Sequence, residues 1–250
     1  MDDKAIIATK ELTKRFGGLT AVDAVDLDIQ EGKITAIVGG NGAGKSTFIK
    51  MISGVYQPTS GQVFYDGKPL PVGDPLAVRN LGIETIYQDL SLIELLDVPD
   101  NIFLGREKYR KMMGFRILDK EFMLQESRRI MDELKIRIPS LSLSTGSLSG
   151  GQRQAVSIGR AIYWNAKVII MDEPTAALGI QEKSKVKELI LDLKSQGVTI
   201  IVISHEMSDV FEICDNIVVF FQGQCVGNKE KEKTTIDEIA KLIITGQGLN

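Results

Sequence analysis

Several features that would point to particular classes of protein are missing from this sequence. The 250 residues carry 30 Lys and Arg against 33 Asp and Glu, so the net charge of −3 gives no footprint for nucleic acid or anionic lipid. No apolar run approaches the roughly 18 residues of a membrane-spanning helix. The first residues, MDDKAIIATKELTKRF, lack the apolar core of a signal peptide. We therefore expect no nucleic-acid partner, and we expect any work at a membrane to depend on partner proteins.

Cysteine and histidine are also scarce. Cys214 and Cys225 lie in or beside apolar runs, which favours buried, reduced thiols in the cytoplasm over a disulfide. His205 is the only histidine, and a lone histidine after a strand is more often structural than catalytic. Any histidine-specific pH dependence of an activity must nevertheless come from this residue.

The most informative stretch is ITAIVGGNGAGKST, residues 34–47. It predicts a strand that leads into a glycine-rich loop and then a helix from Thr47, which is how proteins present a phosphate-binding loop. Gly39, Gly44, Lys45 and Ser46 meet the pattern G-x-x-x-x-G-K-[ST]. Glycines let backbone N–H groups surround an anion. Lys45 adds charge for the outer phosphates, and Ser46 offers a hydroxyl to Mg²⁺. The pattern alone does not separate a kinase, a GTPase and a motor protein.

Apolar strands alternate with amphipathic helices through much of the chain. Antiparallel strands are expected between residues 5 and 29, and Asp66-Gly67 predicts a hairpin. Strands at 83–87, 168–171, 198–204 and 217–221, with helices between them, are typical of a parallel sheet covered on both faces. Residues 89–139 instead predict a helical insertion. Asp119 would cap a helix reaching Leu134, and its apolar face would comprise Phe122, Ile130, Met131 and Leu134.

Two carboxylates follow an apolar strand in VIIMDE, residues 168–173. The end of such a strand is where open α/β sheets bind ligands. Asp172 would hold Mg²⁺, directly or through water, and Glu173 would orient or deprotonate a water that attacks a γ-phosphate. The alternative is a solvated strand end followed by a helix cap.

The stretch LSGGQ, residues 148–152, predicts a second anion site. Ser149 would cap a helix, and Gly150 and Gly151 would leave its first N–H groups uncovered. As structure alone, the stretch would be a good helix start and nothing more. Two phosphate-type sites lie roughly a hundred residues apart in one chain. This arrangement suggests a nucleotide held between two copies.

These motifs together resemble the ATP-binding cassette (ABC) ATPases over nearly the whole chain. GGNGAGKST resembles the Walker A loop, VIIMDE the Walker B strand and LSGGQ the family signature. Gln88 stands at the position of the Q-loop glutamine, and Ser204-His205 matches the switch histidine. Phe16 alone would be a turn filler, but it matches the aromatic residue that stacks on adenine. The resemblance implies an α/β P-loop NTPase fold, RecA-like with a mostly parallel sheet, an antiparallel β subdomain and a helical subdomain. We expect a single ABC ATPase domain over 1–250, with the helical subdomain at about 89–152.

The resemblance also implies ATP and Mg²⁺ as cofactors and assigns roles to residues. The catalytic residues would be Glu173, His205, Lys45 and Gln88. ATP would be bound by Phe16, Gly39, Gly40, Asn41, Gly42, Ala43, Gly44, Lys45, Ser46 and Thr47. ATP on a second copy would be contacted by Leu148, Ser149, Gly150, Gly151 and Gln152. The metal would be held by Ser46, Gln88 and Asp172.

Two positions depart from the family pattern. Gly179 replaces the aspartate that many family members carry in the loop crossing the dimer interface, so that contact cannot be carried over. Gly40 occupies a loop position that is usually bulkier, and it should bind phosphate equally well through its N–H.

Several stretches resemble one branch of the family, the ATPases of bacterial monosaccharide importers of the ribose and fructose type. They include IETIYQDLSLIELLDVPDNIFLGRE and MDEPTAALGIQE. This branch implies a homodimer at the cytoplasmic face of the membrane, bound to permease subunits and, through them, to a sugar-binding protein. A soluble cassette ATPase and a P-loop kinase or GTPase are the alternatives. LSGGQ and the lack of a guanine-reading Asn-Lys-x-Asp stretch oppose the second of these.

Overall fold

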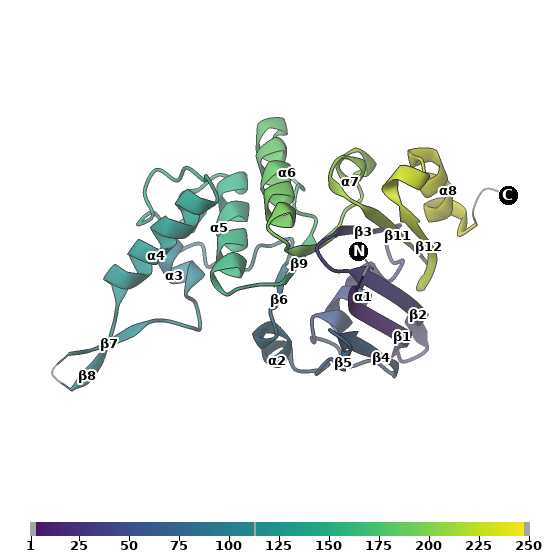
Figure 1. Ribbon diagram of the computed structural model, residues 1–250, viewed down its shortest axis with the longest axis horizontal. Coiled ribbons are helices and arrows are strands. Elements are labelled where there is room, and N and C mark those ends of the chain that lie inside the picture. The colour runs from purple at the N-terminus through teal and green to yellow at the C-terminus, as the bar shows by residue number, and fades with distance from the viewer. Residues whose placement is uncertain (1–3, 113, 248–250) are drawn as a thin grey trace. The chain divides into compact units, whose positions relative to one another are not determined.

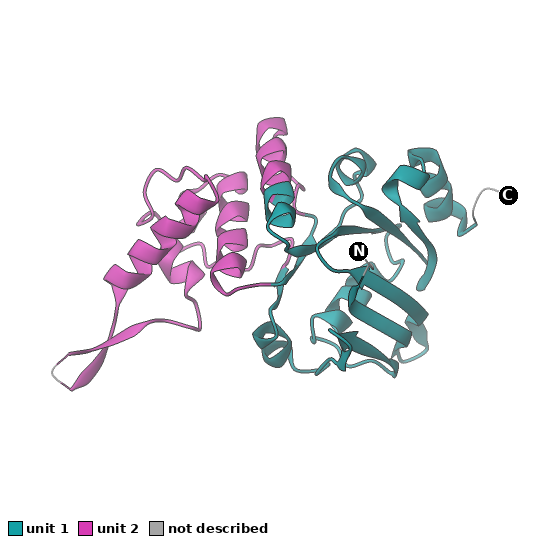
Figure 2. Cartoon of the chain, viewed as in Figure 1, with its two compact units in different colours: residues 1–85, 167–173, 190–250 teal, residues 86–166, 174–189 magenta. Residues whose placement is uncertain are grey.

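A computed structural model describes residues 4–112 and 114–247 of the chain (Figure 1). Two compact units make up the fold (Figure 2). The first contains residues 1–85, 167–173 and 190–250, and the second contains residues 86–166 and 174–189. The mixed α/β architecture with a mostly parallel sheet confirms the predicted fold class.

A six-stranded sheet forms the centre of the first unit, in the order β12-β11-β3-β10-β9-β6. Strands β3, β9, β10 and β11 are parallel, whereas β12 pairs antiparallel with β11 at one edge. The sequence interpretation missed β12 because its residues are mostly exposed and polar, like a turn. The strand bounds are β3 (Ile34–Gly39), β6 (Ile83–Ile86), β9 (Val168–Asp172), β10 (Thr199–Ile203), β11 (Asn216–Phe221) and β12 (Gln224–Glu230).

The strands β3, β9, β10 and β11 of this sheet are buried on both faces, as their continuous apolar sequences predict. One face packs with helix α1 and the antiparallel strands into one hydrophobic cluster that includes Ile37, Ile201 and Phe220. Helices α7 and α8 lie on the other side of the sheet (Figure 1). The helices of this unit are α1 (Lys45–Ile52), α2 (Pro75–Asn80), the last part of α6 (Ile180–Ser195), α7 (Met207–Ile213), the short 3₁₀ turn Lys231–Lys233 and α8 (Ile236–Thr245).

A four-stranded antiparallel sheet completes the first unit, in the order β2-β1-β4-β5. Asp66 and Gly67 both have positive φ, 48° and 73°, as the predicted two-residue hairpin turn requires. The strands are β1 (Ala5–Phe16), β2 (Leu19–Gln30), β4 (Ser60–Tyr65) and β5 (Lys68–Pro69).

Helices dominate the second unit, and the predicted subdomain at about 89–152 falls within its sequence range. Asp119 caps α4 through a hydrogen bond from the N–H of Phe122, as predicted. The predicted apolar face is partly wrong, because Met123 is buried whereas Phe122 is 40% exposed. The unit contains α3 (Val98–Ile102), α4 (Lys120–Glu133), the 3₁₀ turn Thr145–Ser147, α5 (Gly150–Tyr163) and the first part of α6 (Ile180–Ser195).

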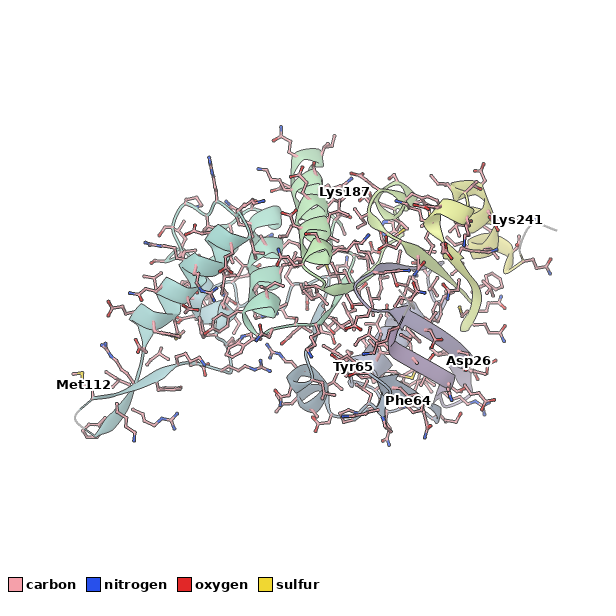
Figure 3. The ribbon with its side chains drawn as sticks, viewed as in Figure 1. Asp26, Phe64, Tyr65, Met112, Lys187 and Lys241 are labelled. Carbon is pink, nitrogen blue, oxygen red and sulfur yellow. The ribbon has the colours of Figure 1, made fainter. Side chains whose placement is uncertain are left out.

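A β-hairpin, formed by β7 (Tyr109–Met112) and β8 (Phe115–Leu118), was not predicted within this helical stretch. It extends away from the helices of its unit, and Met112 lies near its tip (Figure 3). Both strands are largely exposed, so they lack the apolar alternation by which a strand is predicted.

Candidate nucleotide-binding site

The phosphate loop joins the end of β3 to the start of α1, as predicted, although α1 begins at Lys45, two residues before the predicted start at Thr47. Glycine is required at both ends of the loop. A Cβ on Gly39 (φ 152°) would lie only 2.3 Å from the carbonyl oxygen of Phe220. A Cβ on Gly44 (φ 102°) would lie 2.4 Å from the carbonyl oxygen of Ala21. Gly40 is different, because an added Cβ would meet no atom within 4 Å. A bulkier residue at position 40 therefore fits the fold, and glycine there is not a packing requirement.

Lys45 folds back over this loop from the first turn of α1. Its Nζ donates hydrogen bonds to the carbonyl oxygens of Gly39 at 2.7 Å and Gly40 at 3.0 Å. Burial lowers the pKa of Lys45, and the charges of Glu173 and Asp172 act in the opposite direction. Asn41, Gly42 and Ser46 are exposed, so the outer surface of the loop is open to a ligand. The loop thus presents backbone N–H groups and one ammonium group on the same short segment.

The two carboxylates come at the end of β9, beside β10 in the sheet. Burial, and then the charge of Glu173, raises the pKa of Asp172, while Lys45 lowers it. Glu173 has a φ of 53°, a left-handed conformation that is uncommon for a residue other than glycine. Its N–H donates to the carbonyl oxygen of Ile203 at 2.9 Å, which holds this conformation in place. Strained backbone of this kind often occurs at functional sites.

His205 and Glu173 are in direct contact. Nδ1 of His205 lies 2.7 Å from Oε1 of Glu173. The register between β10 and β9 pairs Ile203 with Asp172, and this pairing brings the residues that follow each strand together. Because a carboxylate only accepts hydrogen bonds, Nδ1 must carry the proton, which leaves Nε2 as the free ring nitrogen. The imidazole is exposed (67% of the side chain) whereas Glu173 is largely covered (16%). The histidine ring is therefore open to solvent on the side away from Glu173.

Phe16 ends β1 with 43% of its surface exposed. Tyr56, which the sequence interpretation did not single out, supports this ring edge-on at 5.4 Å between ring centroids. The Lys14 ammonium lies 5.2 Å from the centroid of the Phe16 ring. Phe16 is thus a fixed aromatic surface with an open part, consistent with a stacking role. Tyr56 lacked a sequence signal because its role depends on a contact 40 positions away in the chain.

The signature stretch LSGGQ starts α5 in the second unit. Ser149 is the N-cap: its Oγ accepts the N–H of Gln152 at 3.3 Å, while its own N–H donates to Oε1 of Gln152 at 3.0 Å. Nε2 of Gln152 donates to the carbonyl oxygen of Arg137, so both the oxygen and the nitrogen of this side-chain amide form hydrogen bonds inside the second unit. A Cβ on Gly150 would lie 2.7 Å from Leu178. The start of α5 is therefore a reciprocally capped helix end, at which a side chain on residue 150 would have to displace that of Leu178.

Gln88 is exposed in a turn after β6 and belongs to the second unit. The first unit thus contains the phosphate loop, Phe16, Asp172, Glu173 and His205, and the second contains Gln88 and the signature.

Comparison with known proteins agrees with these motifs. A model of the ABC transporter family matches residues 22–176. The chain is 43% identical over 238 residues to the xylose/arabinose import ATP-binding protein XylG of Sulfolobus acidocaldarius, covering 95% of this chain and 93% of XylG. It is 44% identical over 246 residues to the fructose import ATP-binding protein FrcA of Rhizobium meliloti, covering 96% and 94%. It is also 36% identical to the ribose import ATP-binding protein RbsA of Clostridium tetani, of whose length it spans only 48%.

Solved structures give the same result. The fold resembles MJ1267, an ATP-binding cassette of an ABC transporter in its ADP conformation, with a TM-score of 0.81, 28% identity and coverage of 97% and 96% of the two chains. It resembles the dimeric post-hydrolysis state of the cassette MJ0796, bound to ADP and Pi, with a TM-score of 0.75, 26% identity and coverage of 90% and 98%.

The fold and the phosphate loop define a nucleotide-binding α/β protein of the P-loop class. The chain belongs to the ABC transporter family, and it is an ATPase of that family.

Proposed function

We propose that the chain is the ATP-hydrolysing subunit of an importer for a monosaccharide, acting as a single ABC ATPase domain. The names of XylG, FrcA and RbsA, all sugar import ATP-binding proteins, support the substrate class. No helix in residues 4–112 and 114–247 has the length and apolar character to cross a membrane. The chain would work at the cytoplasmic face of the membrane on separate permease subunits, which receive sugar from a binding protein.

The observation that carries the hydrolytic function is the pair formed by Glu173 and His205. Because Oε1 of Glu173 is engaged by Nδ1 of His205, Oε2 remains to accept a proton from an attacking water. The left-handed backbone of Glu173 fixes where that carboxylate points. With a proton on Nε2 as well as on Nδ1, His205 would donate a hydrogen bond from Nε2 to the γ-phosphate and help to position the water.

The remaining residues of the first unit would bind ATP. Lys45 would exchange its contacts with the loop carbonyls for the outer phosphates, and the N–H groups of residues 39–47 would surround them. Phe16 would stack on the adenine ring.

Ser46, Asp172 and Gln88 would hold Mg²⁺. They supply a hydroxyl, a carboxylate and an amide oxygen, the hard oxygen ligands that this ion prefers, and Mg²⁺ usually takes few ligands from protein and the rest from phosphates and water. When bound, the ion would neutralise charge that develops on the phosphates.

Two copies would enclose two ATP molecules. Each ATP would lie between the phosphate loop of one copy and the signature residues of the other, Leu148, Ser149, Gly150, Gly151 and Gln152. The likeness to the dimeric cassette MJ0796 supports such self-association. ATP binding would close the dimer, and hydrolysis would reopen it.

Replacing Glu173 by Gln tests this function. The variant should bind Mg²⁺-ATP with near-normal affinity and lose turnover by about 100-fold or more, the contribution expected of a general base. It should accumulate as a dimer with ATP on a sizing column, whereas Glu188→Gln, an equal charge change on the exposed face of α6, should behave as wild type. Normal phosphate release by Glu173→Gln would remove this residue from its role.

Sugar uptake tests the substrate class. Cells in which Lys45 of this chain is replaced by Ala should lose uptake of one labelled pentose or hexose and keep uptake of a labelled amino acid and a disaccharide. Unchanged uptake of every monosaccharide, with another solute lost, would reject the assignment.

A further inference from the structure

One carboxylate in the second unit serves the N-termini of two helices. Glu182 is the third residue of α6, and its Oε2 accepts a hydrogen bond of 3.3 Å from the N–H of Gly179. The same carboxylate lies at the start of α5, where its Cδ is 3.6 Å from the place that a Cβ on Gly151 would take, and where the hydroxyl of Ser149 and the N–H of Gly151 act on it as hydrogen-bond donors that lower its pKa. The side chain packs directly on Gly151, where an added Cβ would lie 3.2 Å from Cβ of Glu182. The start of α5 thus already binds an anion, and that anion belongs to its own chain.

These hydrogen bonds use the donors of the signature stretch. Oγ of Ser149 accepts the N–H of Gln152 with a lone pair, and its single hydroxyl hydrogen is directed to Glu182. The hydrogen bond from Ser149, followed by those from Gly179 and Gly151, lowers the pKa of Glu182, as expected for a carboxylate at a helix N-terminus. Neither donor can serve a carboxylate and a phosphate at full strength, and two anions at one helix end repel each other.

We propose that Glu182 is a positioning residue of the nucleotide site between two copies, and that ATP must displace it. In the free chain its carboxylate holds the Ser149 hydroxyl and the Gly151 N–H. When the dimer closes, the phosphate of ATP on the second copy takes these donors. Glu182 therefore sets the ATP concentration at which the dimer closes. This inference rests on the proposed function.

Glu182→Gln removes the charge and keeps the shape of the side chain. The amide oxygen of Gln still accepts the N–H of Gly179, so the start of α6 is retained. Glu188→Gln is the matched control, because Glu188 is exposed further along α6 and contacts Ser184 rather than the signature. Glu182→Asp keeps the charge but shortens the side chain by one carbon, which should weaken its reach to α5.

The experiment measures the dimer fraction against Mg²⁺-ATP concentration, by analytical ultracentrifugation, in chains that carry Glu173→Gln to prevent hydrolysis. Adding Glu182→Gln should lower the half-saturating ATP concentration by about threefold or more, the size expected for removing one charge at a helix end. Glu188→Gln should leave the half-saturating concentration unchanged. The affinity of the dilute, monomeric chain for ATP should be the same in all variants, which a general structural effect would not produce.

A second measurement tests the contact without ATP. In the ¹⁵N-labelled free chain, the amide resonance of Gly151 should move upfield with Glu182→Gln and stay in place with Glu188→Gln. An unmoved Gly151 resonance would show that the contact does not exist and would overturn the inference. The inference would also be overturned if the half-saturating ATP concentration were the same for the Glu182→Gln and Glu188→Gln chains, or higher for Glu182→Gln.

If Glu182→Gln melts well below wild type, Glu182→Asp replaces it, and it too should lower the half-saturating ATP concentration. No ATP-dependent dimer with Glu173→Gln alone would instead reject the proposed function, and the inference with it.

Discussion

Gly39→Ala should distort the phosphate loop at its first residue, where the loop leaves strand β3. Gly39 has a φ of 152°, and a backbone conformation of this kind costs about 1–3 kcal/mol for other residues. The new Cβ would also lie 2.3 Å from the carbonyl oxygen of Phe220, which is paired with Gly39 in the sheet and cannot retreat without disrupting β11. Forcing extra volume into a packed site costs about another 1–3 kcal/mol. We expect the free energy of unfolding to fall by about 2–6 kcal/mol.

At about 2–4 °C per kcal/mol for a chain of this size, the melting temperature should fall by roughly 4–24 °C. ATP affinity should fall with it, because the loop N–H groups would be displaced. Gly40→Ala is the matched control in the same loop. An added Cβ there meets nothing within 4 Å, so the variant should melt at or slightly above the wild-type temperature and bind ATP. Calorimetry and titration with a fluorescent ATP analogue measure both effects. Equal melting temperatures for the two variants, or wild-type ATP affinity in Gly39→Ala, would refute the reasoning.

Three further predictions concern His205, Asp172 and Cys214. His205→Ala should lower ATP turnover by about 100-fold or more while the chain still binds ATP, because Glu173 loses its imidazole partner. Full turnover of this variant in a phosphate-release assay would exclude the role of His205. Burial raises the pKa of Asp172, so the folded chain binds the proton of this carboxyl group more tightly than the unfolded chain does. Protonation of Asp172 therefore stabilises the fold at acid pH, and this stabilisation is lost as the pH rises above the pKa of the unfolded chain, about 4. Asp172→Asn should therefore melt higher than wild type at neutral pH, with a gain that shrinks toward pH 4, and a lower melting temperature at neutral pH would contradict this sign. Burial raises the pKa of Cys214 to about 12, so N-ethylmaleimide at mildly alkaline pH should label Cys214 only as the chain unfolds; rapid labelling of the native chain would show that the thiol is exposed.

Local patterns were predicted well where neighbouring residues are sufficient to specify the structure. The phosphate loop follows a β-branched strand and precedes a helix, and its glycines adopt positive φ within a few positions. Asp119 and Ser149 cap their helices through contacts three residues away. Such features depend on short-range geometry, so a single sequence displays them.

Errors arose where the sequence pattern is weak or the deciding neighbour is distant. The strand β12 and the hairpin of β7 and β8 are mostly exposed and carry no apolar alternation. Met123 rather than Phe122 enters the core of the second unit, because the direction of approach of the neighbouring elements decides which side of α4 is covered.

The sequence by itself determined the class of this protein. The glycines of its phosphate loop and the capping residues of its signature helix are each recognisable from a few consecutive residues, and the motifs follow one another in a fixed order along the chain. Tertiary structure alone decided the contacts that give these motifs their chemistry. Glu173 meets His205 because β9 and β10 are neighbours in register, and Glu182 reaches Ser149 because two helix ends pack through glycine. Such pairings depend on which elements lie side by side, and spacing along a chain does not contain that information.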